Sequence, residues 1–233
     1  MNILAIGAHP DDLEILCGGT LALFSKGKNK VLMCHACDGS KGSIDHTSEK
    51  ISAIRREEAN QSAAIINAES IPGGFVDGEI ILDLQSRIKM VNIIRYANPD
   101  VIITHHSSDY HTDHINVGRL VFDSVYLANV KLFKADYKSI DKLPILYYMD
   151  TLAGINFNPL EFVDISKTIE IKINMMLKMK SQVSFLEEIH DENIGEYIRT
   201  TARYRGYQAG ASYAEGFIRH QIYPVPNIRR ILP

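Results

Sequence analysis

In the first half of the chain, short uninterrupted apolar runs alternate with longer segments in which apolar residues recur at helical spacing. The apolar runs predict strands at 2–8, 31–37, 75–76 and 101–104. The periodic segments predict helices over about 13–26, 47–67 and 82–97. Strands that are apolar throughout are typical of a parallel sheet covered on both faces. The order of these elements therefore predicts an α/β fold with a doubly wound, Rossmann-like, mostly parallel sheet and helices on both faces.

The second half of the chain gives weaker signals. We expect strands at Ile145–Met149 and 162–163, and one helix across 166–186, because that segment is too long for a strand. No internal repeat, low-complexity tract or linker rich in proline, glycine or serine divides the sequence. We therefore expect one domain over residues 1–233.

Composition excludes several classes of protein. A net charge of −3 and a pI near 6.3 argue against a basic surface for nucleic acid. The longest stretch without Asp, Glu, Lys or Arg, 15–25, has eleven residues, and a membrane-spanning helix needs about 20. The start of the chain lacks the basic segment of a secretory signal, and three cysteines are too few for a disulfide framework. We expect a cytoplasmic protein that binds neither nucleic acid nor membrane.

Polar residues gather directly after two of the predicted strands. Of the nine histidines, five lie at position 9 or within 105–114. The first cluster is Ala-His-Pro-Asp-Asp at 8–12, and the second is the segment 105–114. In an open parallel sheet, ligands bind beyond the carboxyl ends of the strands where the strand order reverses. In the common order 3-2-1-4-5, strands one and four are neighbours, so both clusters should meet in one crevice.

The residue types in these clusters suit a catalytic metal site. Zinc accepts imidazole and carboxylate, and its catalytic sites use three protein ligands and leave one position open. His9 and Asp12 are three residues apart on a tight turn, and so are His111 and His114 where a helix is expected to begin. Asp11 is placed to take a proton from a water molecule. The same turn taken alone is equally typical of a helix N-cap formed by Asp11 or Asp12.

Two neighbouring features have alternative readings. His105 and His106, at the end of a predicted strand, are alternative ligands to His111 and His114 or supporting hydrogen-bond donors. The segment 34–37 has the Cys-x-x-Cys spacing of redox and zinc motifs. Residues three apart on a strand point to opposite faces, so we expect both of these cysteines to be buried apolar side chains.

The paired motifs resemble the signatures of the LmbE-like, or PIG-L, zinc de-N-acetylase family. The resemblance rests on Ala8-His9-Pro10-Asp11-Asp12 together with Asp109-x-His111-x-Asp113-His114. Four further segments match the pattern of the family: Gly18-Gly19-Thr20, Arg55-x-x-Glu58, Asp77-Gly78 and Tyr213-Ala214-Glu215-Gly216-Phe217. The chain departs from the pattern at Ser40, where an acidic residue is usual, and at Met179, where a histidine is frequent. These departures bear on substrate identity and leave the metal motifs intact.

The resemblance implies a role for each motif residue. Zinc would be held by His9, Asp12 and His114, although histidine and aspartate ligands suit Fe²⁺ as well. Asp11 would be the general base that activates water. His111, oriented and made more basic by Asp113, would stabilise the oxyanion and help to protonate the leaving amine. Two further positions match residues that hold sugar hydroxyls, Arg55 and Asp77.

The resemblance also implies the activity: hydrolysis of the N-acetyl group of an amino sugar of the N-acetylglucosamine type, free or conjugated. The substrate would be a small molecule, and relatives of the family often form homo-oligomers. One rival interpretation is a metallo-amidase that acts on a longer N-acyl amide. Another is a catalytically silent metal-binding α/β module. The presence of Asp11 beside the ligands argues against the silent module, because structural zinc sites are normally closed by four protein ligands.

Overall fold

The structure is a computed structural model and describes residues 1–190, 193–221 and 231–233. Its strands are β1 Asn2–Gly7, β2 Lys30–Cys37, β3 Glu69–Phe75, β4 Val101–Thr104, β5 Ile145–Met149, β6 Glu161–Asp164 and β7 Ala214–Arg219. Its α-helices are α1 Asp12–Lys26, α2 Ser48–Ile65, α3 Leu84–Ala97, α4 Thr112–Asn129, α5 Ile169–Met176, α6 Lys180–His190 and α7 Ile194–Ala209. A short 3-10 helix, η1, spans Leu152–Gly154.

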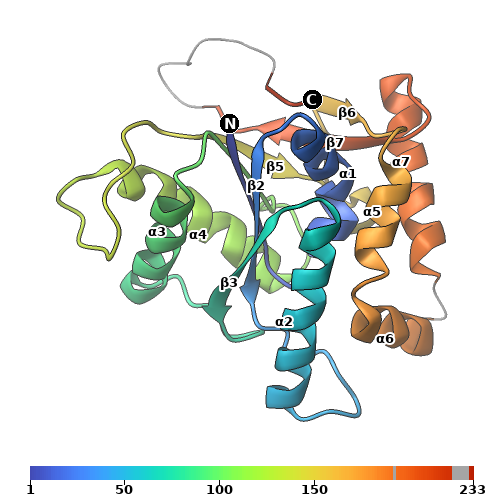
Figure 1. The fold of residues 1–233 in the computed structure, drawn as a ribbon, viewed down its shortest axis with the longest axis horizontal. Coiled ribbons are helices and arrows are strands. Elements are labelled where there is room, and N and C mark those ends of the chain that lie inside the picture. Colours follow the sequence, from blue (N-terminus) through green and yellow to red (C-terminus); the bar gives the residue numbers. More distant parts are fainter. Residues whose placement is uncertain (191–192, 222–230) are drawn as a thin grey trace.

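The seven strands form one sheet in the order β3-β2-β1-β4-β5-β7-β6 (Figure 1). The strands from β3 to β5 are parallel, and β7 runs antiparallel to both β5 and β6. The predicted doubly wound α/β class is confirmed, and β1 and β4 are neighbours as expected. In the part of the chain that the structure describes, no helix is long and apolar enough to cross a membrane.

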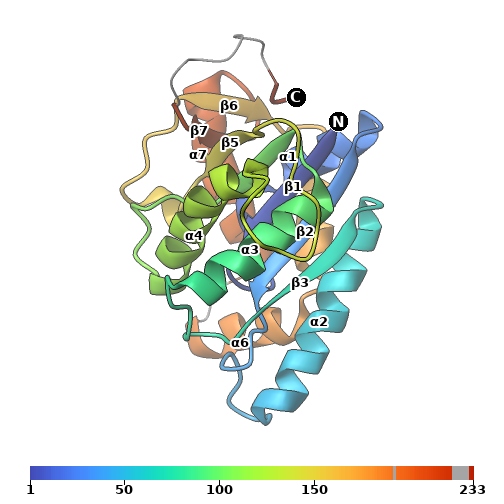
Figure 2. The ribbon, with the colours of Figure 1, turned by 90° about the vertical axis from the view of Figure 1, so that its left-hand side faces the viewer.

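The sheet separates two apolar layers, and successive residues of a strand alternate between them. Ile3 and Ala5 of β1 join the layer beneath α1, α2 and α5, whereas Leu4 and Ile6 join the layer beneath α3 and α4. Figure 2 shows α3 and α4 together on one face of the sheet. This double burial explains why the strands are apolar along their whole length.

The close approach of α4 to the end of β4 depends on a glycine. Gly118 faces the chain at His105, and a Cβ on Gly118 would lie 2.4 Å from the carbonyl oxygen of His105. Any larger residue would push the helix away from the sheet. This contact therefore fixes how close α4, with its first turn, lies to the end of the sheet.

Two elements differ from the predictions because their sequences lack the expected patterns. β3 begins at Glu69 instead of residue 75 and runs through Pro72, Gly73 and Gly74. It is the edge strand, where proline is tolerated because one side of the strand needs no hydrogen bonds. β7 was not predicted, because its segment contains a buried Glu215 and a glycine where apolar residues were expected.

The single helix predicted across 166–186 is wrong, because the structure divides this segment into α5 and α6. The backbone turns between them, and Glu58 of α2 stabilises the start of α6. Its carboxylate accepts hydrogen bonds from the Ser181 backbone N–H at 2.8 Å and from the Ser181 hydroxyl at 2.6 Å. Periodicity cannot show this break, because the partner that fixes it comes from a distant helix.

The prediction that Cys34 and Cys37 point to opposite faces is also wrong. Both are buried, as expected, but both belong to the apolar layer on the α3 and α4 side of the sheet. The β2–β3 register shifts between His35 and Cys37, and such an irregularity breaks the alternation of a strand. Cys37 therefore faces the first turn of α4.

A buried ion pair fixes β7 against the helices. Lys172 of α5 and Glu215 of β7 are each about 3% exposed and form a salt bridge. The Glu215 carboxylate also accepts the backbone N–H groups of Gly19 at 2.9 Å and Thr20 at 2.8 Å. The pair therefore ties α5 and β7 to the middle of α1.

We predict that Glu215→Leu lowers the free energy of unfolding by about 3–5 kcal/mol, because it leaves the Lys172 ammonium buried and unpaired. The double variant Glu215→Leu/Lys172→Met should recover part of that loss. Urea denaturation measures both. Lys30→Gln, which breaks the exposed Lys30–Glu69 pair, is the control and should change stability by less than about 1 kcal/mol. Equal losses in the single and double variants would contradict the prediction.

Candidate metal centre

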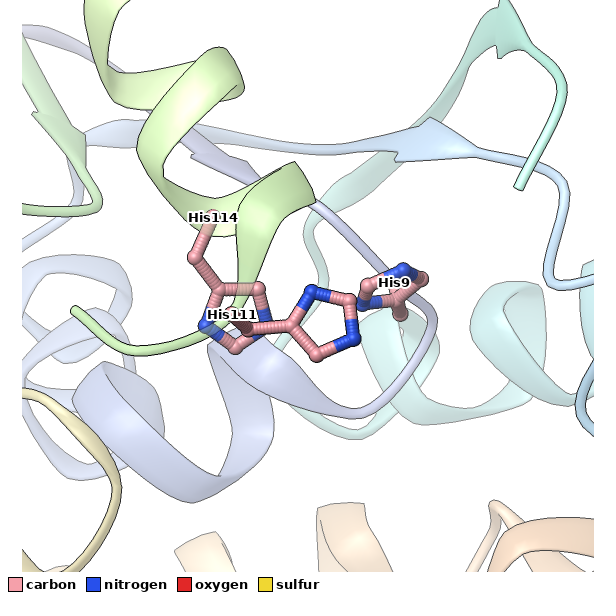
Figure 3. Close-up of side chains that lie close together, drawn as sticks. All are labelled: His9, His111 and His114. Atoms are coloured by element: carbon pink, nitrogen blue, oxygen red, sulfur yellow. The ribbon is translucent and has the colours of Figure 1, made fainter. Parts of the chain in front are cut away.

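The two polar clusters meet at the carboxyl ends of β1 and β4. His9 lies in the loop between β1 and α1, and His111 and His114 lie at the start of α4. Their ring centroids are 4.9 Å apart for His9 and His111, 5.5 Å for His9 and His114, and 4.7 Å for His111 and His114. Figure 3 shows the three rings lying together at the edge of the sheet. The strand order brings these residues into one crevice.

The carboxylate of Asp12 lies between two of these histidines. Its Oδ1 is 3.2 Å from His114 Nε2, and its Oδ2 is 3.6 Å from His9 Nδ1. Oδ2 also accepts the backbone N–H of His9 at 2.7 Å, which tightens the turn that carries both residues. Asp12 therefore presents one oxygen atom to each imidazole.

The second nitrogen of each imidazole is held by a carboxylate. His114 Nδ1 is 3.0 Å from Asp109 Oδ2. His9 Nε2 is 3.2 Å from Asp77 Oδ1 and 3.3 Å from Asp113 Oδ2. A carboxylate on one ring nitrogen fixes the tautomer and orients the other nitrogen as a ligand. This pattern leaves His9 Nδ1 and His114 Nε2 as the nitrogens that can bind a metal ion, and both face Asp12.

The charges in the crevice favour a bound cation. Burial alone would lower the pKa of His9, but its hydrogen bonds to Asp113 and the other nearby carboxylates raise that pKa to about 12. Burial opposes the same effect at His114, where Asp12 and Asp109 raise the pKa to about 10. Both imidazoles are therefore positively charged near neutral pH, until a bound metal ion displaces one proton from each ring. The carboxylates outnumber the cations that the protein itself provides here.

The donor set fits a divalent metal ion. Among the described residues, two clusters of ligand-capable side chains share His114: one adds His9 and His111, and the other adds Asp12 and His105. A tetrahedral ion with bonds of about 2.0–2.2 Å has neighbouring ligand atoms roughly 3.3–3.6 Å apart. The separation of 3.2 Å between Asp12 Oδ1 and His114 Nε2 is close to this spacing, whereas His9 Nδ1 faces the other oxygen of Asp12 at 3.6 Å. The crevice can therefore hold a metal through nitrogen and oxygen atoms.

His105 lies behind this site and contacts the loop after β1 and the carboxylate of Asp12. It is fully buried, and its Nε2 lies 2.9 Å from the backbone nitrogen of Ala8 and 3.2 Å from Asp12 Oδ2. Burial lowers the pKa of His105 to about 4, so the ring is neutral at pH 7. His106 lies apart from the site, with its ring against Tyr148 and Phe157.

Asp11 has a strained backbone and a perturbed carboxyl group. Its φ angle is 134°, which a residue with a side chain rarely adopts. Burial raises the pKa of Asp11 to about 7, although the Arg55 guanidinium, with Nη2 3.6 Å from Asp11 Oδ2, lowers it. Such strain persists only where the surrounding contacts impose it, and it is frequent at functional sites.

Arg55 imposes part of this conformation. It is 3% exposed, and it donates to the carbonyl oxygen of Pro10 from Nη2 and to that of Gly39 from Nη1, each at 3.2 Å. Nη2 also donates to Gln182 Oε1 at 2.5 Å. Arg55 thus fastens the loop before Asp11, a positioning role that sequence spacing did not indicate. Its expected contact with a sugar hydroxyl stays a prediction.

The structure places the remaining motif residues as follows. Asp77 follows β3 and joins the metal crevice through His9, and it also accepts the Lys41 backbone N–H at 3.3 Å. The Asp113 carboxylate contacts His9 and accepts the Gly78 N–H at 2.7 Å. Its backbone N–H, and not its carboxylate, meets His111 Nδ1 at 3.2 Å. Burial and then the charges of the neighbouring histidines lower the pKa of the partly exposed His111.

A cavity of about 410 Å³ opens beside the centre. Asp11 and Asp12 line one side of it, and among the other lining residues are Tyr110, Gln182 and Tyr197. The two tyrosines carried no recognisable signal in the sequence, because they come from a loop and from α7 and are brought here only by the fold. The cavity gives a small molecule access to Asp11.

The chain is similar to known proteins over most of its length. A family model described as PIG-L, GlcNAc-PI de-N-acetylase, matches residues 4–125. The diacetylchitobiose deacetylase of Thermococcus kodakarensis is 30% identical over 228 residues, which cover 92% of this chain and 81% of that protein.

Two solved structures share the fold. The N,N'-diacetylchitobiose deacetylase of Pyrococcus horikoshii, in complex with its inhibitor MPG, is 25% identical with a TM-score of 0.82, over 94% of this chain and 83% of that one. The 4-carboxy-2-hydroxymuconate hydratase of Pseudomonas putida is 22% identical with a TM-score of 0.83, over 98% and 100%. With a family model that matches half of its length and a relative that is 30% identical along most of it, the chain belongs to the PIG-L family of de-N-acetylases.

Proposed function

We propose that this enzyme is a zinc-dependent hydrolase that removes the N-acetyl group from an N-acetylated amino sugar or its conjugate. The observation that carries the proposal is the position of Asp11. Its carboxyl group, with a pKa raised to about 7 by burial, lies on the wall of the cavity next to the metal crevice. A general base is most effective when its pKa is near the working pH.

His9, Asp12 and His114 would hold the ion, and Fe²⁺ fits the same donors. A divalent ion bound there supplies Lewis acidity toward the acetamide carbonyl and lowers the pKa of the attacking water. The protein supplies the remaining functions. Asp11 accepts a proton from the water while the oxygen atom of that water bonds to the carbonyl carbon of the acetamide.

His111 stabilises the oxyanion that forms in this step. Because its Nδ1 accepts the Asp113 backbone N–H, its Nε2 carries the proton and can donate a hydrogen bond. Its pKa is lowered, so we assign it as a neutral donor, where the resemblance implied a protonated one. Asp11 then returns its proton to the leaving nitrogen. The C–N bond breaks, acetate and a free amine leave, and the second proton of the water passes to the amine or to solvent.

The substrate class follows from the lining of the cavity. Tyrosine rings and an amide such as Gln182 suit the faces and hydroxyl groups of a sugar. A relative named for its action on diacetylchitobiose is similar over most of this chain, which favours an N-acetylglucosamine unit. Arg55 and Asp77 remain predicted contacts to its hydroxyl groups.

Hydration of an unsaturated acid is a second candidate, because a hydratase has the same fold. The charged side chains among the described residues that line the cavity are Asp11 and Asp12. A metal ion on Asp12 could bind one carboxylate of such a substrate, but no arginine or lysine is among the described lining residues to bind the other. The lining of the cavity therefore favours the amino sugar.

A substrate panel tests the proposed function. Zinc-loaded enzyme should release amine from N-acetylglucosamine or diacetylchitobiose, more slowly from longer N-acyl analogues, and should not hydrate an unsaturated hydroxy dicarboxylate. Asp11→Asn should lower kcat by at least about 100-fold with zinc still bound, whereas the exposed control Asp45→Asn should not. Zinc binding without amine release from any substrate would favour the silent module. Unchanged kcat in Asp11→Asn would remove Asp11 as the base.

The pH dependence should report the environment of Asp11. Because its carboxyl must be ionised to accept a proton, kcat/KM should rise with pH as Asp11 loses its proton and then level off. Arg55→Gln removes the cation that lowers the pKa of Asp11, so it should move this limb to higher pH. Arg56→Gln, an exposed neighbour on the same helix, is the matched control. Identical profiles for Arg55→Gln and Arg56→Gln would contradict the assignment.

Metal binding should release protons. The pKa values of about 12 for His9 and about 10 for His114 mean that both rings are protonated near neutral pH before the metal binds. Zinc must displace one proton from each ring, so its apparent affinity should rise with pH. Calorimetric titration of metal-free enzyme in buffers of different ionisation enthalpy measures the release. Binding with no proton release would show that the ion does not use these imidazoles.

A further inference from the structure

A second set of ligand-capable atoms lies at the other ring nitrogen of His9. His9 Nε2, Cys37 Sγ and an oxygen of Asp113 lie within 4.8 Å of one another. The nearest oxygen of Asp77 is 3.2 Å from the same nitrogen. These atoms come from four different segments: the loop after β1, the end of β2, the loop after β3 and the first turn of α4. None of them except His9 belongs to the ligands assigned above.

The distances between these atoms suit a metal ion. His9 Nε2 lies 3.2 Å from Asp77 Oδ1 and 3.3 Å from Asp113 Oδ2, and Cys37 Sγ lies 3.8 Å from that same Asp113 oxygen. A tetrahedral ion with Zn–N, Zn–O and Zn–S bonds of about 2.0–2.3 Å separates its ligand atoms by roughly 3.3–3.7 Å. His9, Cys37 and Asp113 therefore need only small shifts to enclose one ion. Asp77, which faces the same nitrogen of His9, must move toward them to complete a set of four ligands.

One oxygen atom is the focus of this cluster. Asp113 Oδ2 faces three donors: the Gly78 N–H at 2.7 Å, the His9 ring and the Cys37 thiol. The two side-chain donors face it through protons that a cation can displace, and the Gly78 N–H would remain to hold the carboxylate. Metal binding deprotonates a coordinating thiol outright, so Cys37 can change from a weak donor into a thiolate ligand.

We propose that His9, Cys37, Asp77 and Asp113 form a second, inhibitory site for a thiophilic divalent cation such as zinc. The ion bonds to His9 Nε2, to the Cys37 sulfur and to one oxygen of each carboxylate. The Cys37 thiol proton and the proton on His9 Nε2 are released to solvent. His9 then bridges two ions, one on each ring nitrogen. Sulfur ligation selects zinc over magnesium or calcium.

Occupancy of this site should inhibit the enzyme, an effect that rests on the proposed function. The carboxylates of Asp77 and Asp113, which set the tautomer of His9, become ligands themselves. Asp77 is then lost to the substrate. A bridging imidazolate also ties the geometry of the catalytic ion to that of the second ion. Excess zinc should therefore lower turnover.

Cobalt titration tests the site without reference to activity. Metal-free enzyme titrated with Co²⁺ should bind two equivalents and show a thiolate-to-cobalt charge-transfer band in the near ultraviolet. Cys37→Ser should bind one equivalent and lose the band, since the other site contains only nitrogen and oxygen ligands. Cys34→Ser is the matched control, because Cys34 is buried on the same strand away from any ligand cluster among the described residues, and it should keep the band.

Inhibition by excess zinc tests whether occupancy of the second site lowers turnover. In wild-type enzyme and Cys34→Ser, turnover should fall as zinc exceeds one equivalent. Cys37→Ser should keep its basal turnover and need at least about tenfold more zinc for half-inhibition. If Cys37→Ser does not fold, Cys37→Ala replaces it. Absence of the band in wild-type enzyme, or its persistence without Cys37, would overturn the site. Equal zinc inhibition of all three proteins would overturn its inhibitory role.

Discussion

The carboxylate of Asp12, placed between His9 and His114, is the interaction on which this crevice depends. β1 and β4 pair in parallel register up to Ile6 and Thr104, so the loops that follow them leave the sheet side by side. Asp12 joins the loop after β1 to the first turn of α4, because one of its oxygen atoms faces His9 and the other faces His114. Without added positive charge, the surrounding carboxylates would repel one another. The crevice is therefore assembled around a cation, whether two imidazole protons or a metal ion.

The tightness of the first loop sets the position of Asp11. His9 N–H bonds to Asp12, and Arg55 holds the Pro10 carbonyl, so the backbone between them is constrained from both sides. The consequence is the positive φ of Asp11, which keeps its carboxyl out of the metal crevice and on the cavity wall. Strain, burial and the charge of Arg55 all act on one side chain. Its perturbed pKa follows from the same contacts that position it.

The sequence predicts features that follow from the overall alternation of strands and helices. It does not predict contacts that depend on a residue far away in the chain. Apolar strands that end in polar clusters predict both the sheet and the meeting of His9 with His114. The partner of Asp113 could not be read in this way, because spacing alone cannot decide whether its carboxylate or its backbone N–H meets His111. The role of Arg55 depends on the Pro10 carbonyl 45 positions away. The side of the sheet on which the Cys37 side chain lies depends on a local shift in the register of β2 and β3.

The outer carboxylates connect the loops after β2 and β3 to the metal crevice. Asp77 and Gly78 follow β3. Asp77 contacts His9 directly, and the Gly78 N–H donates to the carboxylate of Asp113, which also contacts His9. Lys41, in the loop after β2, donates its N–H to Asp77, next to the position where Ser40 departs from the family pattern. A change in either loop thus moves the carboxylates that fix the tautomer of His9. Because His9 presents one nitrogen to Asp12 and the other to these carboxylates, the two loops can alter the affinity of the site for a metal ion while the ligands stay the same.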